Sequence, residues 1–120
     1  MHYKEFIKLL TTESEHAKVA WQFCVDDWMP QEPPVTILFS AMGDKIAENL
    51  NVIDADKKIR IFSLIEEAMN SHEVLLVTAV ATGLIETMVT TTELNKWVPE
   101  TLSLFGPKSL SHAKCWLGIS

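Results

Sequence analysis

The sequence is poor in basic residues, and this shortage limits the partners that the chain can bind. Ten lysine and arginine residues stand against 16 acidic residues, the formal net charge is −6, and Arg60 is the only arginine. Binding to the phosphates of nucleic acids requires clustered lysine and arginine. We therefore expect no nucleic-acid partner. A basic protein is a better electrostatic match, because opposite charges accelerate encounter.

Cysteines are few, and the first residues do not read as a secretion signal. Cys24 and Cys115 are far apart in the chain and show no paired spacing. Residues 1–7 have neither a long apolar core nor a cleavage site of small residues, so they do not resemble a signal peptide. The simplest expectation is a cytoplasmic protein with reduced thiols.

The common motifs of catalytic and cofactor sites are missing as well. The four glycines are scattered and form no phosphate-binding loop, and no serine lies in a Gly-x-Ser-x-Gly turn. His112 and Cys115 are three apart and could share a metal, but two ligands do not make a metal site. We therefore expect no enzyme activity, no metal and no cofactor.

The most apolar stretch, residues 74–89, organises the predicted fold. Except for Glu86, nearly all its side chains are apolar or small on every face of a helical wheel. A helix that is apolar all round lies inside a protein or a membrane, and a membrane span needs about 20 apolar residues. This stretch is shorter and carries a carboxylate. We therefore expect a buried central helix at about residues 73–90 and no contact with a membrane.

Helical periodicity extends over the rest of the chain. Apolar residues recur at intervals of three and four, and no stretch alternates as a β-strand does. The predicted helices cover residues 3–10, 13–29, 33–50, 54–69, 93–105 with a break near Pro99, and 109–118. A chain of 120 residues is long enough for one sizeable core. We therefore predict an all-α protein in which residues 1–120 form a single compact domain of about six or seven short helices packed round the central helix.

Glu86 is the most informative single residue, because a buried carboxylate must find hydrogen-bond donors or become protonated. No second carboxylate or histidine is spaced in the sequence to assist it in catalysis. We expect a structural role, in which Glu86 accepts hydrogen bonds from the turn at residues 106–109, from the amides that begin the last helix, or from Lys108. Ser109 can cap that helix, and Gly83 lets another segment approach closely. A general acid or base in a small-ligand pocket is the alternative.

Acidic residues and a tryptophan gather around the proline-rich turn between the second and third predicted helices. A partly exposed aromatic residue flanked by carboxylates, as Trp28 is, has the composition of a contact site for a basic partner. Asp44 and Glu48 lie four apart, opposite the apolar face of the third helix. Packing of Trp28 against the turn and an ordinary solvated acidic face are the alternatives. The candidate partner-binding residues are Asp26, Asp27, Trp28, Glu32, Asp44 and Glu48.

Parts of the sequence resemble a small bacterial helical family of uncharacterised function. Residues 83–86 read Gly-Leu-Ile-Glu, residues 104–109 read Leu-Phe-Gly-Pro-Lys-Ser, and the last predicted helix carries a late tryptophan, Trp116. The proline-led helix at residues 34–50 is similar too. Phe105 departs from the family pattern, in which the leucine directly precedes the glycine. Members of this family resemble immunity proteins, the small antitoxins made beside polymorphic or contact-dependent toxins.

The resemblance implies an immunity protein that binds a cognate toxin domain and blocks it by occlusion. Many toxin domains are basic nucleases, which would fit the acidic charge of this chain. One alternative is a non-catalytic helical adaptor or a regulatory protein-interaction module. Another is an enzyme or a small-ligand binder with its pocket round Glu86.

Overall fold

The structure is a computed structural model that describes residues 1–119, and within them it contains helices and no strand. Six helices accompany a longer central one and share a single hydrophobic core with it. They are α1 (Tyr3–Glu13), α2 (Glu15–Trp28), α3 (Val35–Glu48), α4 (Ala55–Met69), α7 (Val98–Leu104) and α8 (Pro107–Leu117), with a short 3-10 turn η1 (Leu50–Val52) after α3. The predicted all-α fold of about six or seven helices is confirmed.

The central helix is longer than the sequence indicated. Its parts, α5 (Val74–Thr78), the π-helical segment η2 (Ala79–Ile85) and α6 (Glu86–Leu94), form one helix of 21 residues. We expected it to end at about residue 90, before the threonines at residues 91 and 92. Instead the hydroxyls of Thr90 and Thr92 donate to carbonyls one turn earlier in the same helix, at 2.9 Å in each case. Threonines bonded in this way remain compatible with a helix.

The chain leaves the central helix at Lys96, whose φ of 64° is in the left-handed region. Pro99 then falls in the first turn of α7, where a proline is favoured because the missing N–H has no helical partner. The start of the predicted helix at residues 93–105 therefore belongs to the end of the central helix, and the rest forms the separate helix α7.

The central helix is long and apolar enough to cross a membrane by length and composition. The buried core helix of a globular protein meets the same criterion. Here 56% of the most apolar 18-residue segment of this helix is buried inside the protein. Val74 at the start of the helix and Leu94 at its end are exposed.

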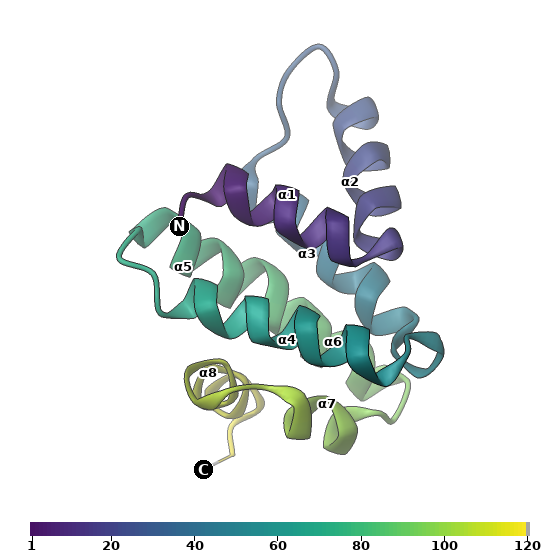
Figure 1. The fold of residues 1–120 in the computed structure, drawn as a ribbon, viewed down its shortest axis with the longest axis vertical. Coiled ribbons are helices and arrows are strands. Elements are labelled where there is room, and N and C mark those ends of the chain that lie inside the picture. Colours follow the sequence, from purple (N-terminus) through teal and green to yellow (C-terminus); the bar gives the residue numbers. More distant parts are fainter. Residues whose placement is uncertain (120) are drawn as a thin grey trace.

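Helices α1 and α4 lie antiparallel on one side of the central helix (Figure 1). At the start of α1, the backbone N–H of Tyr3 donates to Glu73 Oε1 at 3.2 Å, and the Ser71 hydroxyl donates to the Met1 carbonyl at 3.2 Å. At the other end, Arg60 Nε donates to Glu13 Oε2 at 2.8 Å. These contacts fix both ends of α1 to the hairpin formed by α4 and the central helix.

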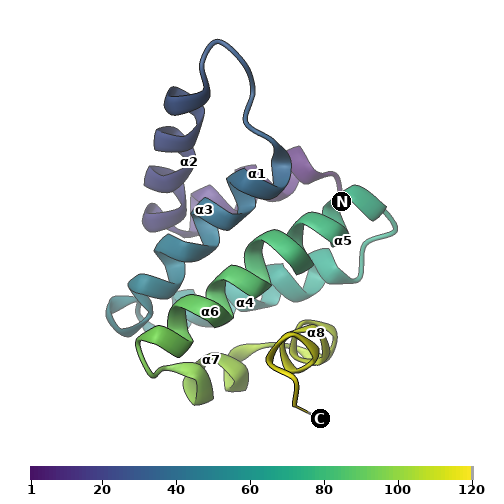
Figure 2. The same ribbon diagram turned by 180° about the vertical axis from the view of Figure 1, so that it is seen from behind.

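Helix α3 runs beside the central helix in the same direction, and α1 and α4 lie behind this pair (Figure 2). Glycines make the contact close: a Cβ on Gly83 would lie 2.8 Å from the Thr36 carbonyl oxygen, and one on Gly43 would lie 2.8 Å from the Leu84 carbonyl oxygen. The expected close approach at Gly83 is therefore confirmed. Helices α7 and α8 cover the end of the molecule that is distant from α2.

Two large apolar side chains whose helical spacing would place them on a buried face are exposed. Ile59 on α4 is 59% exposed and Trp116 on α8 is 53% exposed. Helix α4 instead buries Ile61 and Leu64, because α1, the central helix and α8 contact it on several sides and widen its buried face. A single row of apolar residues at helical spacing does not predict this wider buried face of α4.

Candidate functional site

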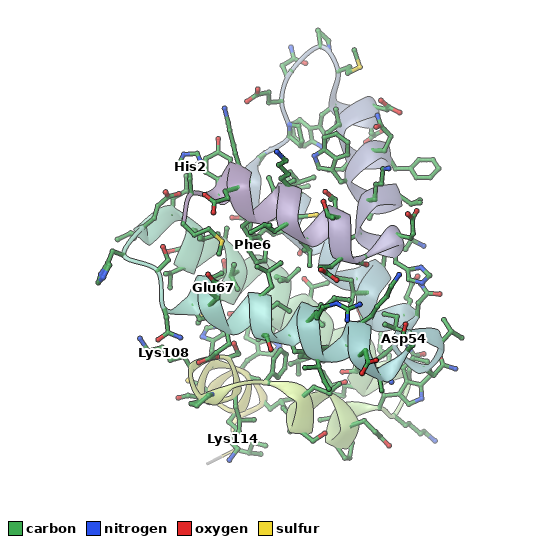
Figure 3. All side chains as sticks on the ribbon, viewed as in Figure 1. His2, Phe6, Asp54, Glu67, Lys108 and Lys114 are labelled. Carbon is green, nitrogen blue, oxygen red and sulfur yellow. The ribbon has the colours of Figure 1, made fainter. Side chains whose placement is uncertain are left out.

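The turn before α8 is bound by a carboxylate, but that carboxylate is Glu66 of α4. Glu66 Oε1 accepts hydrogen bonds from the backbone N–H of Ser109 at 3.0 Å and from the Ser109 hydroxyl at 2.8 Å. Its Oε2 accepts from the backbone N–H of Lys108 at 3.0 Å. The expectation that Glu86 binds this turn was wrong. Ser109 is buried, whereas Lys108, at the start of α8 beside α4, contributes only its backbone and is exposed (Figure 3).

These hydrogen bonds also set the charge state of Glu66. Burial alone would raise the pKa of the carboxyl group, because it disfavours the charged form. The backbone N–H groups of Ser109 and Lys108, the Ser109 hydroxyl and the Asn70 side chain outweigh burial, and the net pKa of Glu66 is lowered. Glu66 is therefore a carboxylate that holds the N-terminus of α8, where negative charge is favoured.

Gly106 is required by the position of Glu66. A Cβ at residue 106 would lie 2.5 Å from Glu66 Cγ and 2.6 Å from Glu66 Cδ. The φ of Gly106 is −72°, so the glycine is needed for space and not for its backbone conformation. The Gly-Pro-Lys-Ser sequence at residues 106–109 is thus explained by helix anchoring alone.

Glu86 has a different partner, His112 of α8. The distance from Glu86 Oε2 to His112 Nε2 is 2.8 Å, and the two side chains are 19% and 29% exposed. The expected tie between the central helix and the last helix therefore exists, but through a histidine that sequence spacing did not place near Glu86. The two residues lie on different helices, and no local pattern could have paired them.

A cleft of about 410 Å³ opens beside Glu86, between α3, α6 and α8. Its other lining residues are Asp44, Thr82, Thr87, Thr90, Thr91, Leu94 and Trp116. The Thr91 hydroxyl donates to Asp44 Oδ1 at 2.6 Å, and the hydroxyls of Thr87 and Ser40 lie 2.6 Å apart. These polar groups hydrogen-bond to one another across the contact between α3 and α6. They therefore stabilise the packing of these two helices.

The chemistry available in this cleft is limited. Glu86 is bonded to His112, which lies outside the lining, and the hydroxyls of Thr87 and Thr91 are engaged with Ser40 and Asp44. Within residues 1–119, no group of three or more histidine, cysteine or acidic side chains is placed to hold a metal ion. The polar side chains that line the cleft are therefore all hydrogen-bonded to other groups of the protein.

The six predicted partner-binding residues fall into two separate groups. Asp26, Asp27 and Trp28 lie at the end of α2, and Glu32 lies in the following loop (residues 29–34). Asp44 and Glu48 lie in the last turns of α3, roughly 13–20 Å along that helix from its first residue. The first group therefore lies near the beginning of α3, and the second lies near its end.

Asp44 and Glu48 also have partners within the protein. Asp44 is partly buried and accepts the hydrogen bond from Thr91, because α6 packs along the side of α3 that helical phase assigned to solvent. Glu48 is exposed and forms an ion pair with Lys45 at 3.1 Å. The expectation that Asp44 faces solvent with Glu48 was wrong.

The outer face of α2 brings acidic and apolar side chains together. It comprises Val19, Phe23, Asp26 and Asp27, which are spaced by four, three and one residues, share one side of the helix, and are all exposed. Phe23 is 73% exposed and Val19 is 47% exposed, whereas Trp28 is half-buried. Residues 19–43 include no lysine, arginine or histidine. The prominent aromatic side chain on this face is therefore Phe23 and not Trp28.

The sequence contained a signal for this face that our prediction overlooked. Phe23 lies out of phase with the helix face formed by Ala17, Trp21, Cys24 and Trp28, so helical phase alone placed it on the solvent side. Helix α2 and its loop also project from the body of the molecule (Figure 1).

Comparison with known proteins gives no relative of this chain: no protein-family model, no curated protein and no solved structure matches it. The resemblance to immunity proteins therefore stays a prediction from the sequence.

Proposed function

We propose that this protein is an immunity protein that binds the basic domain of a cognate toxin and blocks it by occlusion. The observation that carries the proposal is the outer face of α2, where exposed Val19 and Phe23 stand beside exposed Asp26 and Asp27. Glu32 of the neighbouring loop extends the same acidic charge. The proposed contact surface is this face together with Glu32.

The apolar half of this face supports a protein partner. Side chains with large exposed apolar area are common as isolated residues on a protein surface, but Val19 and Phe23 are one helical turn apart and form a pair. Burying such an aromatic anchor in a partner's pocket is the usual source of most of the binding energy at an interface. Phe23 is the anchor in this proposal.

The charged half supports a basic partner. Asp26, Asp27 and Glu32 are exposed, and no basic side chain lies within residues 19–43 to offset them. Charges at the rim of an interface accelerate association and select the sign of the partner, while the apolar anchor slows release. Inhibition by occlusion requires no chemistry from this protein.

Growth rescue tests the proposal directly. The gene would be co-expressed with the toxin domain encoded beside it, and we expect growth to be restored. The variant Phe23→Ala/Asp26→Lys/Asp27→Lys should lose the rescue. The matched control is Leu94→Ala/Glu93→Lys/Glu100→Lys, which changes one exposed apolar and two exposed acidic residues elsewhere and should retain it.

Two results would contradict the proposal. A neighbouring regulatory operon, without a secreted protein that carries a toxic domain, would favour the helical adaptor. Full rescue by the triple variant, in the presence of a toxin that the native protein does neutralise, would exclude the outer face of α2 as the contact surface.

A further inference from the structure

A groove of about 620 Å³ lies between α1, α2 and the loop that joins α2 to α3. The loop arches away from α1 in the ribbon (Figure 1), and residues of α1, α2 and the loop line the groove. Val35 and Leu38 of α3 complete the lining. The groove lies on another side of α2 from Val19, Phe23, Asp26 and Asp27, none of which lines it.

Most of the groove is apolar, and its apolar side chains other than Leu38 are incompletely buried. Ile7, Trp21, Val25 and Val35 line it and are only half-buried, although three of them, Ile7, Trp21 and Val35, also pack against the core. Covering this surface with an apolar chain would remove it from water, which is favourable in proportion to the area buried.

The charged residues of the lining are Lys4 and Lys8 on α1 and Glu32 on the loop. Lys4 and Lys8 are four residues apart, so they project from the same side of α1, and both are exposed. Within residues 1–119, neither lysine forms an ion pair. On a protein of net charge −6, two such lysines at the edge of an apolar groove provide a local site for an anionic group.

We propose that this groove binds an unbranched aliphatic carboxylic acid, with its apolar chain against Trp21, Val25 and Leu38 and its carboxylate between Lys4 and Lys8. The volume is within the range of roughly 300–1,000 Å³ that is typical of small-molecule sites, which are mostly apolar with a few convergent polar groups. Because α1, α2 and the loop wall the groove, a flat bilayer surface cannot reach its apolar lining. Apart from Glu32, which borders both, the groove shares no residue with the proposed toxin-contact surface, and the anion would bind at lysines and not at carboxylates.

Calorimetric titration tests this with two probes of equal chain length and opposite charge. Dodecanoate, below its critical micelle concentration, should bind with a stoichiometry of one, and dodecyltrimethylammonium should not bind measurably. The variant Lys4→Ala/Lys8→Ala should weaken dodecanoate binding roughly tenfold. The control Lys18→Ala/Lys57→Ala makes the same change of net charge at exposed lysines outside the groove, and should bind as the native protein does.

A second pair of variants tests the apolar part of the groove. Met29→Glu places a carboxylate in the lining and should weaken dodecanoate binding, whereas Phe23→Glu, on the outer face of the same region, should not. Both positions are exposed, so neither change disturbs the core; melting temperatures would verify this. The proposal is overturned if dodecanoate does not bind, if the cationic probe binds equally well, or if the Lys4 and Lys8 variant binds as tightly as its control. Binding of an acidic amphipathic peptide in place of dodecanoate would identify a protein-docking groove and would also overturn it.

Discussion

Glu66 and Ser109 are separated by 43 residues in the chain and share two hydrogen bonds, both to the same carboxylate oxygen: the backbone N–H of Ser109 donates at 3.0 Å and its hydroxyl at 2.8 Å. A third bond, from the Lys108 backbone, engages the other oxygen. The N-terminus of α8 is thereby fixed to α4. Because the first N–H groups of a helix have no partner within it, a carboxylate in this position satisfies donors that would otherwise need water.

This arrangement predicts a clear order of stability between two glutamate variants. Glu66→Ala leaves the donors of Lys108 and Ser109 unsatisfied and should lower the free energy of unfolding by about 1–3 kcal/mol. Glu86→Ala breaks one contact, with His112, between partly exposed side chains, and should cost about 1 kcal/mol or less. Urea unfolding of both variants at neutral pH measures the two values. A larger loss for Glu86→Ala would contradict the assignment of Glu66 as the anchor.

The lowered pKa of Glu66 predicts how its contribution depends on pH. A carboxyl group whose pKa is lower in the folded protein stabilises the fold above the pKa of the unfolded chain, about 4.3 for glutamate. That stabilisation is lost as the pH falls from this value through the folded-state pKa. The difference in unfolding free energy between the native protein and Glu66→Gln should be constant from about pH 6 to 8 and should shrink below about pH 4. A difference that grew on acidification would exclude a lowered pKa.

Gly106 and Glu66 should be energetically coupled. In Gly106→Ala the new Cβ meets the Glu66 side chain at distances down to 2.5 Å, so the carboxylate must move and its hydrogen bonds weaken. The same substitution in a Glu66→Ala background has no such clash. A double-mutant cycle should give a coupling energy of roughly 0.5–3 kcal/mol, and a value near zero would show that the two residues do not interact as described.

The positions of the helices were predicted well from the sequence. The predictions that failed concern contacts between helices, which depend on tertiary packing. Local periodicity and proline positions identified every helix, because both act within a few residues. The choice between Glu66 and Glu86 as the anchor of the last turn depended on which helix lies beneath α8, and no local pattern contains that information. Asp44 was misplaced for the same reason, since only the packing of α6 against α3 decides which side of α3 meets solvent.

The close approach at Gly83 was predictable, because a glycine in an otherwise apolar helix has no side chain and leaves room for another backbone. The pair Glu86–His112 and the groove between α1 and α2 were not, because each is formed by segments that meet only in the folded chain. The exposure of Phe23 could have been predicted from its helical phase. We instead chose Trp28, because it lies beside the proline-rich turn and is flanked by carboxylates.

Gly83→Ala should separate α3 from the central helix. Its Cβ would lie 2.8 Å from the Thr36 carbonyl oxygen and 3.0 Å from Phe39 Cβ, and neither backbone nor Cβ can rotate away. Overpacking of this kind costs about 1–3 kcal/mol, which outweighs the gain in helix propensity of roughly 1 kcal/mol from glycine to alanine. Thr82→Ala, at the neighbouring exposed position, is the control and should leave the melting temperature nearly unchanged. Equal melting temperatures for both variants would contradict the close contact.

The last prediction separates the two acidic groups kinetically. Asp26→Lys/Asp27→Lys reverses charges that are exposed and lie beside Phe23, so association with the cognate toxin domain should slow and lose much of its salt dependence, with little change in stability. Asp44→Lys/Glu48→Lys makes the same change of net charge, but it removes the acceptor of the Thr91 hydroxyl and the partner of Lys45. That variant should lower the melting temperature while slowing association less. Stopped-flow association at low and high salt, with melting curves for both proteins, measures these effects. If reversal at Asp44 and Glu48 slows association more than reversal at Asp26 and Asp27, the contact surface lies along α3 and not on the outer face of α2.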